Sequence, residues 1–443
     1  MLEKATIDAE KPGVLDAYLK TISRFLPKHF QWMEKVKDRR NPYFITYSTS
    51  YMVWMGILLF LLKMGSRRQI KYRLNTPVFI QNMNDWVKAD VEQVAHPDTL
   101  AYFCSGLNPK ELEMLLKMDV YSIIRSRALE NQRIFGEYYL VAVDGTETLD
   151  FKERHCPHCL TRKHDDGSVT YYHKVVEAKL VTESGLCLPM ALEFVENSKE
   201  DVPVQDCELL ACYRLLSKLK RFFPQLRICL LMDSLYVNQN IFKTAEENAW
   251  KFIVNYKEGA APSIANEALA IWTLENKSPN TKMHWHDDVE QKYRWAENID
   301  YYGHMINYIE CTETTEKEEK TFVWVTNFPV NSHNVQIIAN QGGRQRWKIE
   351  NQGFNVQKNN GYNLDHSYGG RGQAWKNMHL FMQIAHLINQ LVEYGSLLKA
   401  KIRAVYGSAR NLTRLLLEEL RYYRHSFAPP QDEHVRYIKF QSD

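Results

Sequence analysis

The chain has 443 residues, of which 45% are hydrophobic and 25% charged, with a formal net charge of +3. This ordinary globular composition excludes a disordered or fibrous protein, and the small net charge means that any nucleic-acid surface must be local. The eight cysteines lack the dense spacing of a secreted disulfide scaffold, and the N-terminal residues carry no apolar signal-peptide core. We therefore expect a cytoplasmic protein without a membrane partner.

Residues 1–130 are predicted to form a helical N-terminal region, because apolar positions recur at three- and four-residue spacing. The apolar run 52–62 is too short to span a bilayer and predicts a buried helix. A basic cluster follows it and has two readings, a DNA-backbone contact or a solvated helix face. Its members are Lys63, Arg67, Arg68, Lys71 and Arg73.

Residues 131–258 change to a strand-rich texture that predicts the first part of an α/β core. Three strands, a long amphipathic helix and two further strands fit a mixed sheet with helices on its faces. The expected strands cover 139–143, 171–180, 186–195, 228–232 and 250–256, and the expected helix covers 205–223.

Residues 259–340 are rich in aromatic side chains and alternate like strands near Phe322–Val325, which predicts a β-rich insertion. The acidic run 313–319 within it predicts a solvated hairpin tip. Residues 341–398 are expected to return to the core with a helix that carries Glu350. A helical region, 399–443, completes the chain, and its leucines fit either a dimer interface or packing within one molecule.

Three carboxylates stand where a metal-dependent phosphoryl-transfer site would need them. Asp144 and Asp233 each end an apolar run that predicts a buried strand, and Glu350 lies in a stretch of helical character. Two neighbouring strand ends faced by such a helix can hold a pair of divalent cations. For a single Asp, the alternative is a turn-forming residue at a strand end.

A second cluster contains Cys156 and Cys159, separated by the two residues typical of a zinc knuckle. Histidines 155, 158, 164 and 173 lie nearby, and a pair of them can complete four zinc ligands. A reduced loop without metal is the alternative. For His173 a further reading is a place beside the carboxylates, in contact with substrate phosphate.

From Leu140 to His366 the chain resembles the bacterial DDE transposases of the insertion sequence 4 type. The resemblance is carried by three motifs, Val143–Thr146, Leu231–Tyr236 and Arg346–Phe354. It implies an RNase H-like mixed sheet, with a β-strand insertion ahead of the glutamate helix. It also implies that Asp144, Asp233 and Glu350 are the catalytic residues and bind two Mg²⁺ or Mn²⁺ ions.

The resemblance further implies cut-and-paste transposition, in which strand cleavage at the transposon end is followed by strand transfer. The expected partners are double-stranded DNA with terminal inverted repeats, target DNA, and a second copy of the chain in a homodimer. In relatives that form hairpins, a flipped base stacks on an aromatic side chain. Trp285, Trp295 and Trp324 are candidates for this role, with core packing as the alternative for each.

The sequence departs from the family at the residues around its glutamate. The family has Tyr, Arg, Glu and Lys there; Arg346 fits, but Gly343 stands at the Tyr position. Gln357 stands at the Lys position, with Lys358 one residue late. Arg346 and Lys358 are the predicted contacts with the transposon-end backbone, with ordinary surface charge pairing as the alternative for both.

Two other functions stay open on the sequence alone. One is a domesticated or inactive transposase-derived protein that binds DNA without moving it. The other is an interaction protein stabilised by zinc at the Cys156–Cys159 loop, in which the three carboxylates are incidental.

Overall fold

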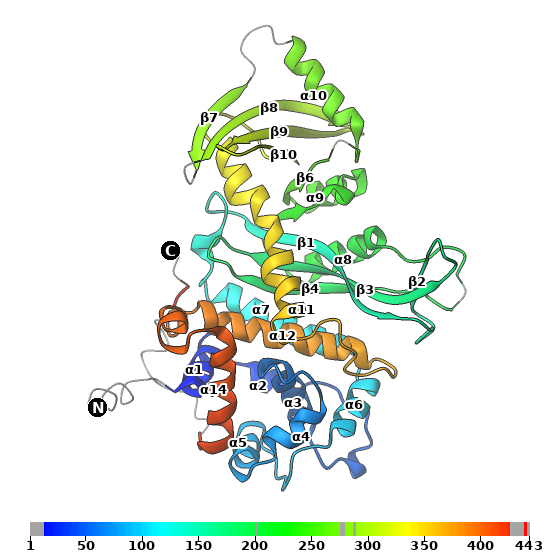
Figure 1. The fold of residues 1–443 in the computed structure, drawn as a ribbon, viewed down its shortest axis with the longest axis vertical. Helices are drawn as coiled ribbons and strands as arrows, with labels where there is room; N and C mark the ends of the chain where they lie inside the picture. The colour runs from blue at the N-terminus through cyan, green and yellow to red at the C-terminus, as the bar shows by residue number, and fades with distance from the viewer. Residues whose placement is uncertain are drawn as a thin grey trace, which may run out of the picture. The chain divides into compact units, whose positions relative to one another are not determined.

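The structure is a computed structural model that describes residues 13–200, 202–257, 259–274, 280–286, 289–425 and 438–440. The chain divides into two compact units, each described here by itself (Figure 1). The helical unit combines residues 1–129 with residues 354–443. The sheet unit comprises Glu130–Gly353.

The helical unit is built around two buried helices, α3 and α12. Ser48 caps α3 by accepting a hydrogen bond from the backbone N–H of Tyr51, and a proline starts each of α5, α6 and α7. The bounds are α1 Val14–Phe25, α2 His29–Met33, a 3₁₀ turn Pro42–Phe44, α3 Thr49–Leu61, α4 Arg68–Leu74, α5 Pro77–Val87, α6 Pro97–Gly106, α7 Pro109–Arg125, α11 Asn355–Asn359, α12 Ala374–Tyr394, α13 Lys399–Lys401, a π-helical turn Ile402–Tyr406 and α14 Ala409–Tyr422.

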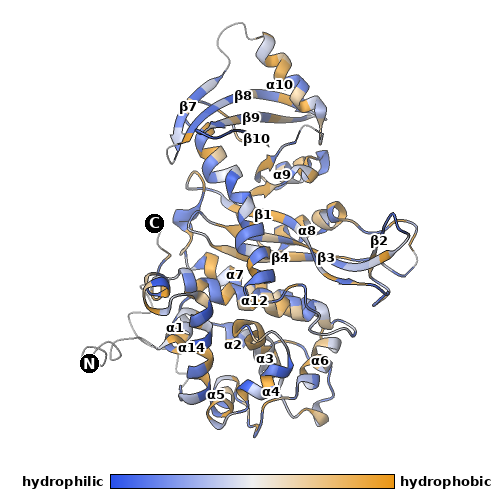
Figure 2. Ribbon diagram, viewed as in Figure 1, coloured by the Kyte–Doolittle hydropathy of each residue, from blue (hydrophilic) through white to orange (hydrophobic). Residues whose placement is uncertain are grey.

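Helix α3 confirms the buried helix predicted from the apolar run. Residues 50–61 are all buried, and the helix is apolar on every side (Figure 2). It packs against α12, which itself buries most of its length. Among the described residues, no helix has the length and apolar character needed to cross a membrane.

The C-terminal leucines pack within the helical unit. Leu412, Leu416 and Leu420 of α14 are buried, and α14 lies against α1 and α5. Intramolecular packing, one of the two readings of these leucines, therefore accounts for them without a dimer interface.

The sheet unit contains one large mixed sheet in its described residues, in the order β2–β3–β1–β5–β6–β10–β9–β8–β7, with β4 paired to β3. The strands are β1 Tyr139–Phe151, β2 Leu160–Lys163, β3 Val169–Val181, β4 Cys187–Val195, β5 Ile228–Met232, β6 Lys251–Asn255, β7 Thr281–His286, β8 Val289–Tyr301, β9 His304–Thr314 and β10 Glu319–Thr326. The helices are a 3₁₀ turn Glu130–Gln132, α8 Glu208–Phe222, a 3₁₀ turn Ser234–Tyr236, α9 Gln239–Glu247, α10 Pro262–Leu274, and π, 3₁₀ and π segments at Ile337–Gly342, Gly343–Trp347 and Ile349–Phe354.

The predicted order of strands and crossover helix is confirmed. β3 pairs antiparallel with β1 and with β4, α8 follows, and β5 then lies parallel to β1 and to β6. The apolar face of α8 packs against β3 and β4, which places the core between helix and sheet. β2 was not expected, since its four residues carry no apolar alternation.

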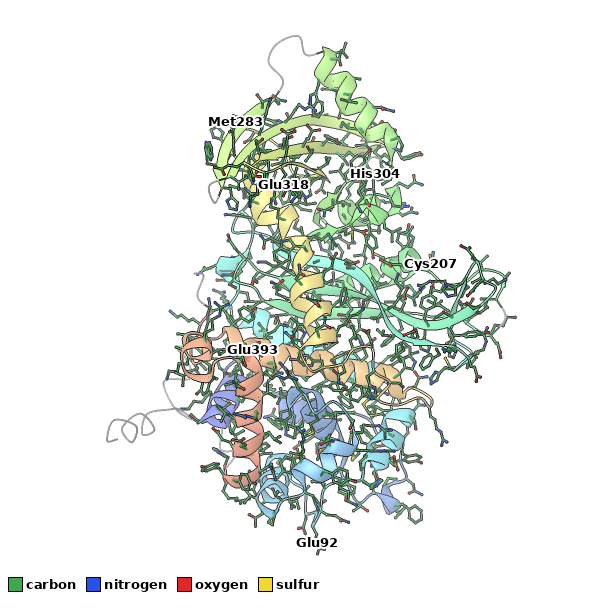
Figure 3. The ribbon with its side chains drawn as sticks, in the orientation of Figure 1. Glu92, Cys207, Met283, His304, Glu318 and Glu393 are labelled. Atoms are coloured by element: carbon green, nitrogen blue, oxygen red, sulfur yellow. The ribbon has the colours of Figure 1, made fainter. Side chains whose placement is uncertain are left out.

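The predicted β-rich insertion begins with a helix and extends the sheet. α10 covers β8 and β9 (Figure 1), and β10 pairs antiparallel with β6, so the insertion strands continue the core sheet. The acidic run forms the exposed tip between β9 and β10, where Figure 3 labels Glu318.

The boundary between the sheet unit and the C-terminal part of the helical unit lies after Gly353, whereas the sequence analysis expected a boundary near residue 399. Residues 354–398 belong with the N-terminal helices, because α12 packs against α3, α6 and α7. The glutamate segment up to Gly353 remains in the sheet unit.

Candidate active site and metal centre

Asp144, on β1, and Asp233, directly after the neighbouring parallel strand β5, occupy matching positions in the register of these strands. Tyr139 pairs with Ile228 and Ala142 with Leu231, and the same register continued by two residues sets Asp144 opposite Asp233. Asp233 directly follows β5, and its Oδ1 accepts the backbone N–H of Leu235 at 2.9 Å.

The sequence predicted that Asp144 ends its strand, and this prediction is wrong. Asp144 lies in the middle of β1. The pairing of β1 with β5 ends at Ala142, whereas the pairing of β1 with β3 continues to Phe151. The Asp144 carboxylate therefore lies where the sheet opens on one side. Its Oδ1 accepts the backbone N–H of Gly145 at 2.8 Å, which fixes its orientation.

Glu350 is linked to Asp144 through Arg346. Nη2 of Arg346 donates to Oε1 of Glu350 at 2.7 Å, and its Nη1 lies 3.4 Å from Oδ2 of Asp144. Glu350 lies in the π-helical segment Ile349–Phe354 and is half exposed. π-helical turns of this kind are rare and occur frequently at functional sites.

Burial and mutual repulsion make this a site that favours protons or cations. Burial, together with the charges of Asp233 and Glu350, raises the pKa of Asp144 to about 7 against the opposing effect of Arg346. The pKa of Asp233 is also raised, chiefly by burial. The three predicted carboxylates are thus electrostatic neighbours, with Arg346 as their counter-ion.

A fourth carboxylate, Glu208, was missed by the sequence reasoning. It lies in the first turn of α8 and forms an ion pair with Lys174, and the hydroxyl of Tyr236 donates to its Oε1 at 2.7 Å. A Cβ at Gly145 would lie 2.5 Å from Cδ of Glu208, so a larger residue there would require this carboxyl group to shift. An acidic residue at the start of the predicted helix was the available signal, but its approach to Gly145 is a tertiary contact.

The departures from the family motif have local explanations. A Cβ at Gly343 would lie 2.3 Å from Nε1 of Trp324, so the indole fills the space of a larger residue. Gln357 is fully buried in the helical unit, where its Nε2 lies 2.9 Å from Oε1 of Gln383. Lys358 of α11 pairs with Asp365 at 3.6 Å.

In the basic cluster, Arg67 contacts neighbouring residues of the protein, whereas Arg68 and Lys71 are exposed to solvent. Arg67 donates to the carbonyl of Pro97 at 2.8 Å and lies 3.7 Å from Asp98. Arg68 and Lys71 are exposed on α4, as a backbone-binding or a solvated face requires.

The three candidate tryptophans of the insertion differ in their exposure to solvent. Trp295 and Trp324 are only 4% and 2% exposed to solvent, which agrees with core packing, the alternative given for each. Trp285 of β7 is 65% exposed and is the tryptophan of the three whose ring is open to a ligand.

His173 lies in the cysteine cluster, and its reading as a phosphate ligand beside the carboxylates does not fit this position. Its Nε2 is 3.6 Å from Sγ of Cys156 and 3.6 Å from Sγ of Cys159, and the two sulfurs are 3.6 Å apart. His155 completes the group, and the four potential ligand atoms all lie within 4.8 Å of one another. His173 is fully buried.

Comparison with family models finds no match, and no curated relative matches the sequence. Among solved structures, the chain is similar to a cryo-EM structure of the piggyBac transposase synaptic complex with hairpin DNA. That likeness has a TM-score of 0.42 and 10% identity, and it covers 95% of this chain and 84% of the other. At this distance it carries no argument about fold or function.

Proposed function

We propose that the protein is a DDE transposase that cleaves and joins DNA strands at the inverted-repeat ends of a mobile element. The observation that carries this proposal is the matching register of Asp144 and Asp233 on parallel strands, with Glu350 linked to Asp144 through Arg346. The order of β4, β3, β1, β5 and β6, with its α8 crossover, is compatible with an RNase H-like core.

The residues of this site fit Mg²⁺ or Mn²⁺. Asp144, Asp233 and Glu350 offer carboxylate oxygens, the donor type that these hard cations prefer, in surroundings that raise the pKa of Asp144 to about 7. A bound pair of ions would supply an activated water and charge stabilisation for the leaving oxygen.

The protein side chains hold and balance this site. Backbone N–H groups of Gly145 and Leu235 orient the two aspartates. Arg346 pairs with Asp144 and Glu350 in the metal-free protein. A bound cation would take over this charge balance, and Arg346 would then be free to contact a DNA phosphate. Such a contact would position the backbone without reading its sequence.

The proposed partners are double-stranded DNA ends, target DNA and a second copy of the chain. Exposed Arg68 and Lys71 are proposed to contact the DNA backbone, as is Lys358 once released from Asp365. Trp285 is proposed, in place of Trp295, to stack on an unpaired base because its ring is exposed.

The test is cleavage of end-labelled DNA that carries the inverted repeats flanking the gene, with Mg²⁺ or with EDTA, on a denaturing gel. We expect metal-dependent nicking at the repeat boundary, abolished in Asp144→Asn, Asp233→Asn and Glu350→Gln with DNA binding retained. Glu318→Gln, at the exposed hairpin tip, is the matched control and keeps full cleavage.

Binding without cleavage in the wild type would contradict catalysis and indicate a DNA-binding protein derived from a transposase. Cleavage retained in Asp144→Asn would remove this residue from the site.

A further inference from the structure

We propose that His155, Cys156, Cys159 and His173 bind one structural zinc ion. This inference is independent of the proposed function, since it concerns a different set of residues and is read out by metal content. The four side chains come from the loop between β1 and β2 and from β3, and their ligand atoms lie within 4.8 Å of one another.

The spacing of the ligand atoms matches a tetrahedral zinc site. With Zn–S of about 2.3 Å and Zn–N of about 2.0–2.1 Å, two sulfurs lie about 3.8 Å apart and a sulfur and a nitrogen about 3.6 Å apart. Here the Cys156 and Cys159 sulfurs are 3.6 Å apart, and each is 3.6 Å from Nε2 of His173. Both cysteines are free thiols rather than a disulfide.

The fourth ligand, His155, is held in place by an aromatic contact. Its ring stacks on Phe151, the last residue of β1, with centroids 4.4 Å apart and planes 5° from parallel. Its buried Nδ1 has no hydrogen-bond partner among the described residues. An imidazole fixed in this way, with a buried nitrogen unused, is prepared to accept a metal.

A second layer of contacts orients the two cysteines. The backbone N–H of Cys159 donates to the carbonyl of Cys156 at 3.3 Å, which closes the turn between them. Nδ2 of Asn197 donates to the carbonyl of Cys159 at 3.0 Å, and Nδ1 of His158 lies 2.8 Å from the carbonyl of Asn197. His158 is thereby directed to Asn197 and lies outside the ligand group.

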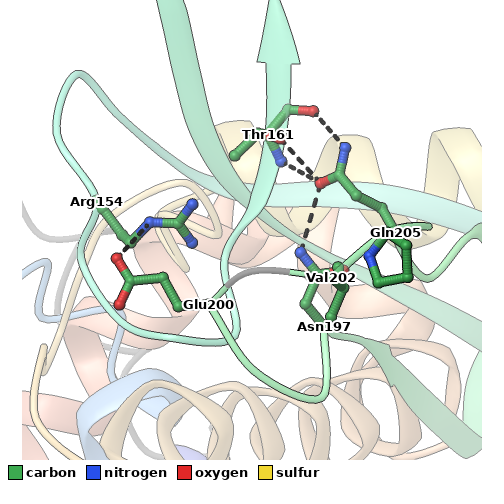
Figure 4. Close-up of a pocket in the computed structure, with 7 residues that line it drawn as sticks. Arg154, Thr161, Asn197, Glu200, Val202 and Gln205 are labelled. Carbon is green, nitrogen blue, oxygen red and sulfur yellow. Dashed lines mark hydrogen bonds and ion pairs between the residues drawn. The ribbon is translucent and has the colours of Figure 1, made fainter.

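The surrounding loops are fastened to the same strand edge. Figure 4 shows Asn197 and Gln205 beside Thr161, the second residue of β2. Oε1 of Gln205 accepts a hydrogen bond from the backbone N–H of Thr161 at 2.6 Å. Residues 152–158 form bends, turns and irregular backbone between two strands, and the carbonyl of His158 accepts the backbone N–H of Asn197 at 3.3 Å. Four protein ligands make a closed site, which indicates a structural rather than catalytic ion.

A zinc ion here would fix the projecting arm formed by β2 and the paired ends of β1 and β3. Phe151 pairs with Tyr171 and Leu149 with His173, so the metal would join the loop to the middle of this arm. The loop and arm contain four basic residues, Lys152, Arg154, Arg162 and Lys163. These are also trypsin sites, which makes the order of the arm measurable.

The test starts with zinc content of the full-length protein, purified without chelator and measured by elemental analysis. We expect one zinc per chain, with two sulfur and two nitrogen ligands in zinc-edge X-ray absorption. The sulfur signal excludes an ion held only by the carboxylates, and Asp144→Asn should keep its zinc.

Variants then assign the ligands. Cys156→Ser and His173→Gln should each lose zinc, whereas Cys207→Ser and His164→Gln should keep it. Cys207, labelled in Figure 3, is an exposed cysteine outside the group, and His164 is an exposed histidine that contacts Thr170. The X-ray absorption result on the wild type decides the proposal even if a ligand variant fails to fold.

Zinc removal by a strong chelator should expose the arm to trypsin. We expect roughly tenfold faster cleavage at residues 152–163, because opening of the loop no longer requires loss of the metal. Cleavage at Arg68 and Lys71 on α4 should not change.

Absence of zinc in the wild type with no uptake of added Zn²⁺ or Co²⁺ would overturn the proposal. So would a bound ion without sulfur ligands, or a disulfide between Cys156 and Cys159 in protein kept under reducing conditions.

Discussion

The guanidinium of Arg346 lies 3.4 Å from the carboxylate of Asp144 and so occupies the charge position that a bound cation would take. The same guanidinium pairs with Glu350, four residues further along the chain on the same helical face. It is largely buried, at 13% side-chain exposure, so the interaction is only partly screened by solvent. Arg346 and a divalent cation bound at this site would therefore compete for the same carboxylates.

This competition predicts that Arg346→Gln binds Mn²⁺ more tightly than the wild type. Removal of one positive charge near two carboxylates should raise the affinity about tenfold, equivalent to ~1.4 kcal/mol, after discounting for partial exposure. Titration calorimetry or Mn²⁺ electron paramagnetic resonance measures it. Arg344→Gln is the control, because Arg344 pairs with Glu313 instead. Equal affinities for Arg346→Gln and wild type would show that Arg346 does not compete with the ion.

The raised pKa of Asp144 predicts the pH dependence of stability in the metal-free protein. The folded pKa is about 7 against an ordinary 3.8, so between these values the folded state binds the proton more strongly than the unfolded state. Stability from this group is therefore full at low pH and falls as the pH rises toward about 7. Denaturant unfolding in EDTA should show this decline, and Asp144→Asn should flatten it.

A decline of the same slope in Asp144→Asn would assign the pH dependence to other groups. Glu318→Gln, which changes an exposed carboxylate at the hairpin tip, should leave the wild-type profile unchanged. Added Mg²⁺ should raise the stability most at the higher pH values, since the cation and the proton compete for the carboxylates.

The sequence predicted those parts of the fold that depend on local patterns. Apolar runs located the strands that bear Asp144 and Asp233, and the amphipathic stretch located α8. The place of His173 could not be predicted, because it depends on the antiparallel register that pairs it with Leu149. Apolar alternation sets which face a residue occupies but not which residue lies opposite.

The glycine at the family's Tyr position illustrates the same limit. Nothing near Gly343 in the sequence indicates that Trp324, on β10, lies against it. The division of the chain after Gly353 likewise depends on packing of α12 against helices near the N-terminus.

Gly343→Ala should destabilise the sheet unit. The added Cβ would lie 2.3 Å from the Trp324 indole, which is 98% buried and must shift. Overpacking of this kind costs about 1–3 kcal/mol in the free energy of unfolding. Chemical denaturation followed by tryptophan fluorescence measures both the loss and any change around Trp324. Gly259→Ala, in the same unit, meets no atom within 4 Å and should be close to neutral.

Glu208 should tune the proton affinity of the carboxylate site. Its negative charge raises the pKa of Asp233, so Glu208→Gln should lower that pKa. Glutamine keeps an Oε1 atom for the hydroxyl of Tyr236 and loses only the ion pair with Lys174. The pH midpoint of Mn²⁺ binding should therefore move to lower pH, because Asp233 releases its proton earlier.

The matched control is Glu193→Gln, whose carboxylate pairs with Arg214 and Lys218 of α8. This variant also removes ion pairs with basic residues, but Glu193 is not among the main groups that shift the pKa of Asp233 or Asp144. Its midpoint should match the wild type. An unshifted midpoint in Glu208→Gln, with the protein folded and Mn²⁺ bound, would show that Glu208 is a structural neighbour without electrostatic influence on the metal site.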